Sequence, residues 1–392
     1  MSATTQPIKP KIDRSQIMEA LIPVLAVITA LIAGAIIIMV SQLISANLAT
    51  GFKGVSSAST KTPWQTLISA YVGLFQGAFG SPRAISETLI ATTPYILTGL
   101  AVAVGFRGGL FNIGAEGQYY VGSICAVFVG YSFKGLPPFL HITLSMLAGI
   151  VGGGLFAAIP GYLKARFGTH EVINTIMLNY IGVKTIDWLV RGPLRDPKAS
   201  LDQTYYILDS AKLPKLLPWT DLRVHIGIVI ALVMVFVINW LLFKTTLGYE
   251  LRTVGSNPSV ARYAGMSVAR NFVVTMIISG GLAGMAGAVQ QLGMNYTLKA
   301  VFATGYGFDS IAVALLAKSN PFGIIPAALL WGALRNGASL MQVRSNMSID
   351  LINIVQALVI MFVAADQMIR WLYHIKTARD TKVVFTRGWG GG

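Results

Sequence analysis

The sequence predicts an all-α polytopic membrane protein with about ten transmembrane helices. Hydrophobic residues make up 54% of its 392 residues and charged residues only 11%, whereas about a quarter of an average soluble domain is charged. Apolar runs long enough to cross about 30 Å of hydrocarbon recur along the chain. Polar stretches interrupt this pattern once in each half. Paired interruptions of this kind are typical of two inverted repeats with broken helices.

The charge balance fits the same class. In a soluble protein a formal net charge of +15 would suggest a nucleic-acid partner. In a membrane protein it is better explained by Lys and Arg retained in cytoplasmic loops, so we expect membrane lipid around the chain and no nucleic acid. The single cysteine, Cys125, lies in an apolar run and excludes both an intrachain disulfide and a Cys metal cluster.

The chain is predicted to open with a cytoplasmic segment, residues 1–19, ahead of a transmembrane domain at 20–374. The apolar run 20–43 is too long for the h-region of a signal peptide, so it is expected to remain as the first span. Residues 45–86 are expected to be extracytoplasmic, with an amphipathic helix over 64–79 on the outer membrane surface. The further spans predicted in the N-terminal half are 87–106, 117–133, 140–163 and 171–190.

The C-terminal half contains two long polar loops. Residues 191–221 have mixed charge and are predicted to be extracytoplasmic, whereas 244–270 hold four basic residues against Glu250 alone and are predicted to be cytoplasmic. The basic tail 375–392 is also expected inside, so both termini are cytoplasmic. The spans predicted in this half are 222–243, 271–294, 321–341 and 349–373, with a short apolar helix at 308–318.

The two interruptions are the candidate solute path. Gly105–Tyr120 holds five glycines among Arg, Asn, Glu and Gln side chains, and Asn295–Asp309 mixes aromatic and polar residues. Irregular backbone at membrane depth is tolerated only where protein or water surrounds it, and transporters build substrate sites from such breaks. The candidate pathway residues are Asn112, Glu116, Gln118, Tyr119, Asn295, Tyr296, Phe302, Tyr306 and Asp309.

Several of these residues also have a structural interpretation. We favour pairing of Glu116 with Arg107, which would hold the first interruption closed, because an intramembrane acid must be paired or wet. Asp309 is expected first of all to cap the short helix that follows it. Asn112 and Gln118 are neutral donors and acceptors suited to a hydroxylated solute. Aromatic faces would suit a nucleobase by stacking, with ordinary packing as the alternative for each ring.

The chain lacks an energy source of its own. It contains no phosphate-binding loop of the form G-x-x-x-x-G-K-S/T, so it is not expected to bind ATP in the usual way. Its four histidines lie at segment ends and acids deep within the spans are few, whereas a proton-coupled carrier usually has such groups inside its spans. We therefore expect the energy to come from a partner.

The cytoplasmic loop Leu247–Gly265 is a candidate docking point for that partner. A Ser-Asn pair directly before Pro258 predicts a capped short helix that ends at Gly265, with Val260 and Ala261 on one side. An ordinary connector that follows the membrane surface is the alternative. The candidate coupling residues are Arg252, Gly255, Asn257, Pro258, Ala261, Arg262 and Gly265.

Four stretches resemble, in order, inner-membrane permeases of ABC importers in the branched-chain amino acid and simple-sugar group, most of all its nucleoside-uptake branch. They are Gly109–Gln118, Glu171–Asn179, Gly255–Met266 and Gly305–Leu316. The resemblance implies a ten-helix type II importer-like fold in the bacterial cytoplasmic (inner) membrane. It also implies an ABC ATPase subunit that binds ATP and Mg²⁺, a second paralogous permease subunit and an extracytoplasmic substrate-binding lipoprotein.

The leading hypothesis is therefore a permease subunit, without a catalytic site, metal or cofactor of its own, in an ABC importer for nucleosides. The resemblance is to the larger of two paralogous permeases that form a heterodimer. A simple-sugar importer of the same group is the first alternative. A secondary carrier that works alone is a second, and an intramembrane enzyme would need a buried Ser–His pair that the sequence does not offer.

Overall fold

The computed structural model describes residues 14–51, 62–300, 304–346, 353–354, 357–358, 361–362 and 366–374. The chain divides into two compact units, one made of Met1–Ser57 with Asn353–Gly392 and the other of Ala58–Ile352. The candidate Phe302, the basic tail and most of the predicted N-terminal segment lie outside the described residues. The predicted placement of loops on one or the other side of the membrane stays a prediction.

In the first unit, helix α1 (Arg14–Gly51) has 38 residues and extends past both ends of the predicted run 20–43. Ile22 and Ala26 pack against Ile369 of α14 (Asp366–Leu372). The opposite face of α1 repeats an exposed apolar residue every four positions, which suits contact with lipid or another subunit. These residues are Val24, Ile28, Ile32, Ile36 and Val40.

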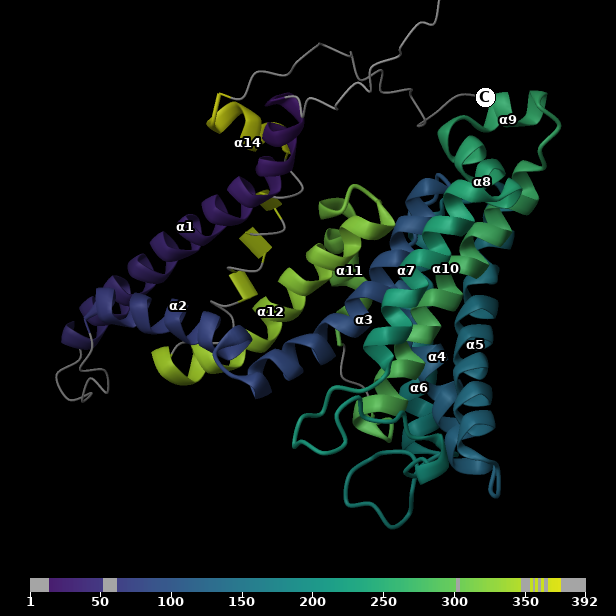
Figure 1. Ribbon diagram of the computed structural model, residues 1–392, viewed down its shortest axis with the longest axis horizontal. Coiled ribbons are helices and arrows are strands. Elements are labelled where there is room, and N and C mark those ends of the chain that lie inside the picture. Colours follow the sequence, from purple (N-terminus) through teal and green to yellow (C-terminus); the bar gives the residue numbers. More distant parts are fainter. Residues whose placement is uncertain are drawn as a thin grey trace, which may run out of the picture. The chain divides into compact units, whose positions relative to one another are not determined.

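The second unit is a bundle of helices whose long members run side by side or cross (Figure 1). The long helices are α2 (Pro63–Phe79), α3 (Pro82–Arg107), α4 (Ala115–Ser132), α5 (Pro138–Phe167), α6 (Glu171–Arg191), α7 (Gly227–Lys244), α10 (Val268–Gln290) and α12 (Pro321–Ser345). The shorter ones are α8 (Thr246–Ser256), α9 (Pro258–Tyr263) and α11 (Tyr306–Leu316), and a π-helical turn, η2 (Gln291–Asn295), continues α10.

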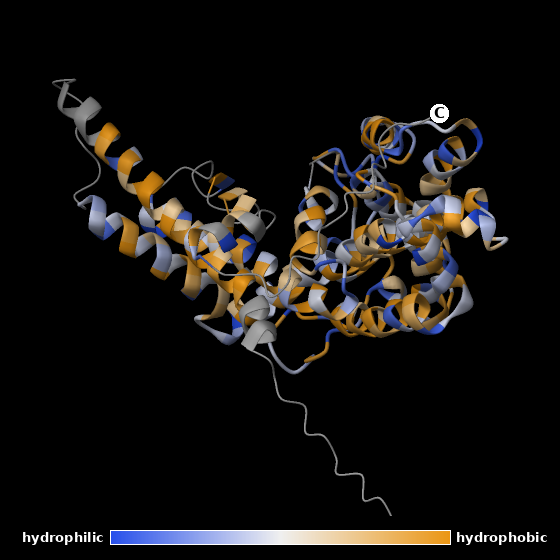
Figure 2. Cartoon of the chain, turned by 90° about the horizontal axis from the view of Figure 1, so that it is seen from above, coloured by the Kyte–Doolittle hydropathy of each residue, from blue (hydrophilic) through white to orange (hydrophobic). Residues whose placement is uncertain are grey.

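Among the described residues, five helices are long and apolar enough to cross a membrane: Val24–Ile44, Pro82–Arg107, Pro138–Phe167, Gly227–Lys244 and Val268–Asn295. Hydrophobic residues extend along these helices (Figure 2). Helices α4 and α12, with 18 and 25 residues, carry more polar side chains, and α6 carries four charged residues. The chain is thus a polytopic membrane protein, and the count of ten spans stays a prediction.

Helix α3 is the central helix of this unit. In its most apolar stretch 83% of the residues are buried, compared with 28% in α5 and 33% in α7. It packs against α10, α11 and α12. Ser81 begins it by accepting a hydrogen bond from the backbone N–H of Ala84 at 3.1 Å, as an N-cap serine does. The side chains of α3 therefore face other helices on nearly every side.

Helices α5 and α10 contact each other through backbone. A Cβ added at Gly153 would overlap the carbonyl of Gly280, and one added at Gly284 would overlap the carbonyl of Gly149. Four glycines therefore face each other in what we call the glycine seam: Gly149, Gly153, Gly280 and Gly284. Such close approach is a usual means of helix association in membranes, where the hydrophobic effect between helices is absent.

Helix α2 has the predicted boundaries within one residue. Thr62 forms a capping box with Gln65: its hydroxyl accepts from the Gln65 N–H, while the Gln65 side chain accepts from the Thr62 N–H. Its buried face packs on α12, where a Cβ at Gly73 would lie 3.0 Å from the Cα of Met341. Its other face exposes large apolar side chains, including Trp64 and Phe75. Its position on the outer membrane surface stays a prediction.

The helical structure is interrupted at both predicted places. The first interruption, residues 108–114, separates α3 from α4. The second interruption, described at residues 296–300 and 304–305, separates η2 from α11, and it starts at Tyr296 with a positive φ of 61°. The loop 192–226 bonds to it: Thr204 N donates to Leu298 O and Ile207 N donates to Tyr296 O, both at 2.9 Å. This loop lies at one end of the bundle, and α8 and α9 lie at the other (Figure 1).

Candidate functional site

Glu116 joins the two interruptions. It lies in the first turn of α4 and is 1% exposed. Its Oε1 accepts from the Gly305 N–H at 2.9 Å and the Thr304 hydroxyl at 3.1 Å, and its Oε2 accepts from the Gly307 N–H at 2.6 Å. These N–H groups belong to the start of α11, where a carboxylate is favoured by the unpaired donors and by the helix dipole. Glu116 therefore caps α11 from a different helix.

Two predicted contacts are corrected by this arrangement. Arg107 does not pair with Glu116; its Nε donates to the carbonyl of Ser319 at 3.1 Å, just beyond the C-terminal end of α11. Asp309 is not the N-cap of the short helix, because α11 begins at Tyr306, three residues earlier than Asp309. The carboxylate of Glu116 satisfies the helix start instead, which leaves the Asp309 side chain free to bond elsewhere.

Asp309 belongs to a polar cluster contributed by α3, α11 and α12. The hydroxyl of Tyr95 donates to Asp309 Oδ2 at 2.7 Å, and Arg335 Nη1 donates to the same hydroxyl at 2.7 Å. The guanidinium of Arg335 also lies 4.4 Å from the centre of the Tyr306 ring, within the range of cation–π attraction. About a third of the Asp309 and Arg335 side chains is exposed, 33% and 38% respectively. The cluster is therefore held by protein on one side and open on the other.

Aromatic rings extend this cluster toward α4. The Tyr306 ring lies 4.9 Å from that of Tyr95 and 5.6 Å from that of Tyr119, and the rings of Tyr119 and Tyr120 are 5.5 Å apart. The Tyr119 hydroxyl is buried and has no hydrogen-bond partner in the described part of the chain. We call the residues Tyr95, Tyr119, Tyr120, Tyr306, Asp309 and Arg335 the aromatic–arginine cluster.

Three members of this cluster, Tyr95, Tyr120 and Arg335, are absent from the predicted pathway residues. Arg335 had a usable signal, because an arginine in the middle of an apolar run such as 321–341 is by default a functional candidate. Tyr95 had none, since a tyrosine beside a proline within a span is equally consistent with packing.

The side chains of Asn112 and Gln118 hydrogen-bond to each other. Asn112 Nδ2 donates to Gln118 Oε1 and to Ser279 Oγ, both at 2.8 Å, and Gln118 Nε2 donates to Asn112 Oδ1 at 3.0 Å. Both side chains are at most 1% exposed. A further bond runs from the Gly114 N–H to Asn112 Oδ1. In this conformation their polar atoms therefore hold the first interruption against α10 instead of facing open space.

A cavity of about 480 Å³ lies beside the second interruption. This volume is within the usual range for small-molecule sites. Gln291 Oε1, which belongs to one of its lining residues, is buried without a hydrogen-bond partner among the described residues. The neighbouring Tyr296 does not line this cavity. Lys212 Nζ lies over its ring, 5.0 Å from the ring centre. The cavity is lined by Tyr120, Arg223, Gln291, Met294, Asn295, Thr297, Leu298, Lys299 and Thr304.

The predicted short helix in the loop 244–270 is α9. Asn257 caps it, with Oδ1 accepting from the N–H groups of Ser259 and Val260 at 3.0 and 3.1 Å, and Pro258 occupies its first position. Gly265 follows the helix with a φ of 78°, a conformation that glycine adopts without strain. Of the Ser-Asn pair predicted to cap this helix, Asn257 is the cap, and the predicted glycine stop is confirmed.

The faces of α9 differ from the prediction in one respect. Ala261 is fully buried, but its neighbour Val260 is 55% exposed, so the two do not share a side. Tyr263, which the sequence reasoning did not single out, is 96% exposed, and Arg262 is exposed beside it. A hydrophobic, a basic and an aromatic side chain therefore project from this helix.

Helix α8 connects α9 to the first interruption. A Cβ at Gly255 would overlap the carbonyl of Arg107 and lie 2.6 Å from the backbone nitrogen of Gly109. Arg252 anchors the same helix to α7: its Nε donates to Leu242 O at 2.9 Å, and its guanidinium lies 4.9 Å from the Phe243 ring centre. The backbone of α8 thus rests directly on the backbone of the first interruption.

The fold and the site define a multi-pass membrane protein whose interrupted helices meet at a buried polar and aromatic cluster. Residues 84–364 match the family described as branched-chain amino acid transport system / permease component. The chain belongs to that family. No solved structure matches it.

Curated relatives extend along most of the chain. The guanosine ABC transporter permease protein NupP of Bacillus subtilis is 42% identical over 91% of this chain and 96% of its own length. The nucleoside ABC transporter permease protein NupB of Lactococcus lactis is 35% identical over 93% and 97%. The glucose ABC transporter permease protein TsgB13 of Haloferax volcanii is 32% identical over 80% and 84%. A further B. subtilis guanosine permease protein, NupQ, is 28% identical over 63% and 79%.

Proposed function

We propose that this protein is a permease subunit of an ATP-driven ABC importer for nucleosides. The observation that carries the proposal is the 42% identity to a guanosine permease, which extends over nearly the full length of both chains. The chemistry of the site supports it. A nucleoside has a flat base with hydrogen-bonding edges and a hydroxylated ribose, and it is matched by aromatic faces, neutral donors and acceptors, and a single guanidinium.

In this proposal the solute moves from the cavity at the second interruption to the aromatic–arginine cluster. Asn295 and Tyr120 line the cavity, and Tyr120 also belongs to the cluster, so the two regions share a residue. The unpartnered Gln291 Oε1 is available to accept from a base or ribose group. At the cluster, the Arg335 guanidinium, which lies over the buried Tyr306 ring, is the flat surface on which a base would stack.

Energy enters at α9 in this proposal. An ABC ATPase subunit, which binds ATP and Mg²⁺, docks on the exposed Val260, Arg262 and Tyr263. Its movement passes through Gly255 to the backbone at residues 107–109. Arg107 then transmits it to the C-terminal end of α11 through the Ser319 carbonyl. Because Glu116 holds the other end of α11, both ends of this short helix are tied to residues that flank the first interruption.

The finer topology belongs to the same proposal. We place both termini, α8 and α9 in the cytoplasm and the loop 192–226 outside the bacterial inner membrane, with ten spans in two inverted repeats. A second, paralogous permease completes the path, and an extracytoplasmic binding lipoprotein delivers the substrate. The second B. subtilis guanosine permease that resembles this chain supports a pair of related permeases.

A panel of labelled solutes tests the substrate. Cells or vesicles that contain the assembled importer are expected to take up guanosine and other nucleosides, with glucose and ribose as poor competitors. The glucose permease relative keeps a simple-sugar importer as the second candidate. Uptake of sugars that nucleosides fail to inhibit would replace the first candidate by the second.

Co-purification tests the docking surface. The substitution Arg262→Glu is expected to release the ATPase subunit, because it reverses charge on the exposed face of α9. Lys134→Glu makes the same change in charge in the exposed turn between α4 and α5 and is expected to leave the ATPase bound. An ATPase that stays fully bound to the Arg262→Glu chain would show that α9 is not the docking element.

A further inference from the structure

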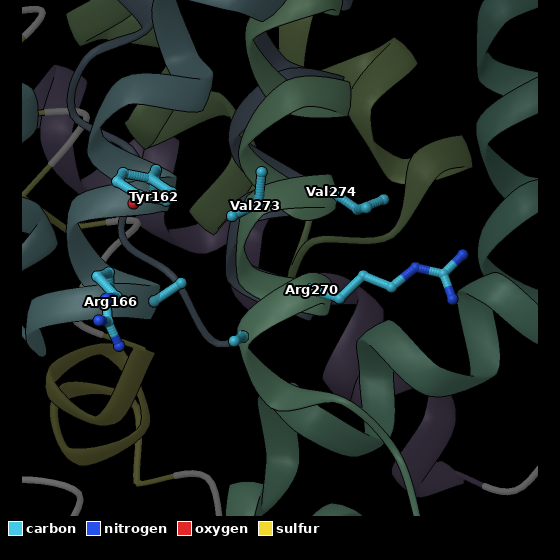
Figure 3. A pocket seen from close by; sticks show the side chains of 7 residues that line it. Tyr162, Arg166, Arg270, Val273 and Val274 are labelled. Carbon is cyan, nitrogen blue, oxygen red and sulfur yellow. The ribbon is translucent and has the colours of Figure 1, made fainter.

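A groove of about 360 Å³ lies between α5 and α10 at the end of the bundle that holds α8 and α9. It is separate from the aromatic–arginine cluster and from the cavity at the second interruption. Figure 3 shows its lining: Tyr162 and Arg166 come from α5, and Arg270, Val273 and Val274 come from α10. Two alanines, Ala165 and Ala269, form the rest of its wall.

The lining separates into a charged edge and an apolar interior. Arg166 and Arg270 lie at the same level at the edge, next to the ends of their helices, and the valines and the tyrosine ring lie farther in (Figure 3). Both arginines are exposed, and neither guanidinium has an acidic partner among the described residues. The Arg270 side chain extends away from α5, so the charge closest to the groove is that of Arg166.

The apolar interior continues along the exposed face of α5. Tyr162, Ile159, Leu155 and Val151 follow each other at intervals of three or four residues and are 57%, 45%, 65% and 54% exposed. This stripe rises about 17 Å along the helix axis, close to half of the roughly 30 Å hydrocarbon core. One acyl chain in one leaflet has this length, whereas a protein partner docked at the helix ends would not need such a stripe.

We propose that this groove binds an anionic phospholipid. The phosphate and the anionic part of the headgroup bind Arg166 and, with a change of side-chain rotamer, Arg270. An acyl chain lies over Tyr162 and along the α5 stripe. Basic pockets between membrane helices recognise anionic headgroups through charge, and the planar guanidinium can donate two parallel hydrogen bonds to a phosphate. The α5–α10 pair thereby gains a lipid at its charged end.

Photolabelling of the assembled importer in nanodiscs tests the site. The probe is a photoactivatable phosphatidylglycerol diluted into phosphatidylcholine, and the matched probe is a photoactivatable phosphatidylcholine. The anionic probe is expected to label the α5 peptide that contains Tyr162, and unlabelled phosphatidylglycerol is expected to compete. Equal labelling of this peptide by the two probes would overturn the proposal.

Variants separate charge from shape. Arg166→Gln and Arg270→Gln are each expected to reduce labelling about 5-fold, and the double variant about 30-fold. The Lys pair at the same positions retains most of the labelling. Ala165→Trp keeps both charges but fills the groove, and it is expected to reduce labelling as well. Lys244→Gln removes a charge at the same end of α7 and is the control without effect.

The same variants distinguish a lipid from a protein partner. If the double Gln variant loses the ATPase subunit while labelling by phosphatidylglycerol is unchanged, the arginines bind an acidic protein surface and the lipid proposal is wrong. Each variant is compared at equal amounts of monodisperse assembly in size-exclusion chromatography. A site that binds lipid is independent of which solute the importer carries.

Discussion

Arg335 places a positive charge among aromatic rings inside the helix bundle. Its guanidinium contacts the Tyr306 ring, the Tyr95 hydroxyl and, at 3.7 Å, the Asp309 carboxylate. Asp309 offsets part of the charge, and the exposed third of the side chain remains available to a solute. At the residue scale, Arg335 is therefore the side chain that tests the proposed solute path most directly.

Arg335→Gln is expected to lower nucleoside uptake about 30-fold, because the cation–π attraction and one charged hydrogen bond are lost, together about 2 kcal/mol. Arg335→Lys keeps the charge without the planar guanidinium, and its uptake rate is expected to lie between those of the wild type and the Gln variant. Initial uptake rates at equal amounts of assembled importer measure both. Wild-type rates in the Gln variant would remove the cluster from the solute path.

Glu116→Gln is expected to destabilise the protein by about 3 kcal/mol. The variant loses a charged acceptor and turns an amide N–H₂ toward one of the N–H groups at the start of α11. Glu171→Gln is the matched control: Glu171 pairs with Lys164 at 2.8 Å with both side chains partly exposed, and pairs of this kind contribute about 0–1 kcal/mol. The midpoints of thermal unfolding of the two purified variants test this expectation. Equal midpoints would contradict the capping role of Glu116.

His225 gives the protein a pH dependence on the acidic side. It precedes α7, outside the span, and burial lowers its pKa from 6.5 to about 4. Its Nδ1 accepts from the Gly227 N–H at 3.1 Å, and its Nε2 has no partner among the described residues. The folded protein therefore binds fewer protons than the unfolded chain between these two pH values.

The stabilising effect of neutral His225 is complete above pH 6.5 and is lost as the pH falls from 6.5 to 4. The loss amounts to about 3 kcal/mol. The midpoint of thermal unfolding is expected to drop across this interval, and His225→Gln is expected to flatten that part of the profile. An unchanged profile in the variant would assign the dependence to other groups.

At the scale of elements, the proposed coupling depends most on the backbone contact between α8 and the first interruption. Gly255→Ala introduces a Cβ where the Arg107 carbonyl already lies, and overpacking of this kind costs about 1–3 kcal/mol. We expect the ATPase to remain bound and to hydrolyse ATP, while nucleoside import per ATP falls.

The ratio of imported nucleoside to hydrolysed ATP, measured in proteoliposomes, checks this expectation. Ser256→Ala changes the next residue, which is exposed, and serves as the control. A Gly255→Ala assembly with the wild-type ratio would place the transmission somewhere other than α8.

The elements with local signals were predictable from sequence. The Asn-Pro start and glycine stop of α9 depend only on neighbouring residues, and so do the two interruptions. The first span, predicted at 20–43, agrees with the apolar stretch Val24–Ile44 within α1, whereas α7 was predicted to begin five residues too early. There, 222–226 are apolar enough to resemble helix but bond instead to residues 214–216.

The site was predictable only in part. Glu116, Tyr119, Tyr306 and Asp309 were singled out, and all four meet around the start of α11. Their partners were not, because Arg335 and Tyr95 come from helices far away in the sequence, and no local pattern encodes which helices are neighbours. The same reason explains why Glu116 was assigned to Arg107, the nearest opposite charge along the chain.

At the scale of the whole molecule, the proposal makes this chain one of two permease subunits that together form the translocation path. Reconstituted into liposomes without an ATPase, it is expected to show no uptake of nucleoside above the leak of empty liposomes, with or without a proton or sodium gradient. Assembly with the ATPase and the second permease restores uptake in the presence of ATP. Gradient-driven accumulation by this chain alone would identify a secondary carrier.

The glycine seam has a consequence for how the molecule can change shape. Where two helices touch backbone to backbone, no side chains can change rotamer to let one slide past the other, and a shift along the axis would push carbonyl oxygens into each other. Helices α5 and α10 are therefore expected to move together as one rigid body. Any opening and closing then has to occur outside this pair of helices.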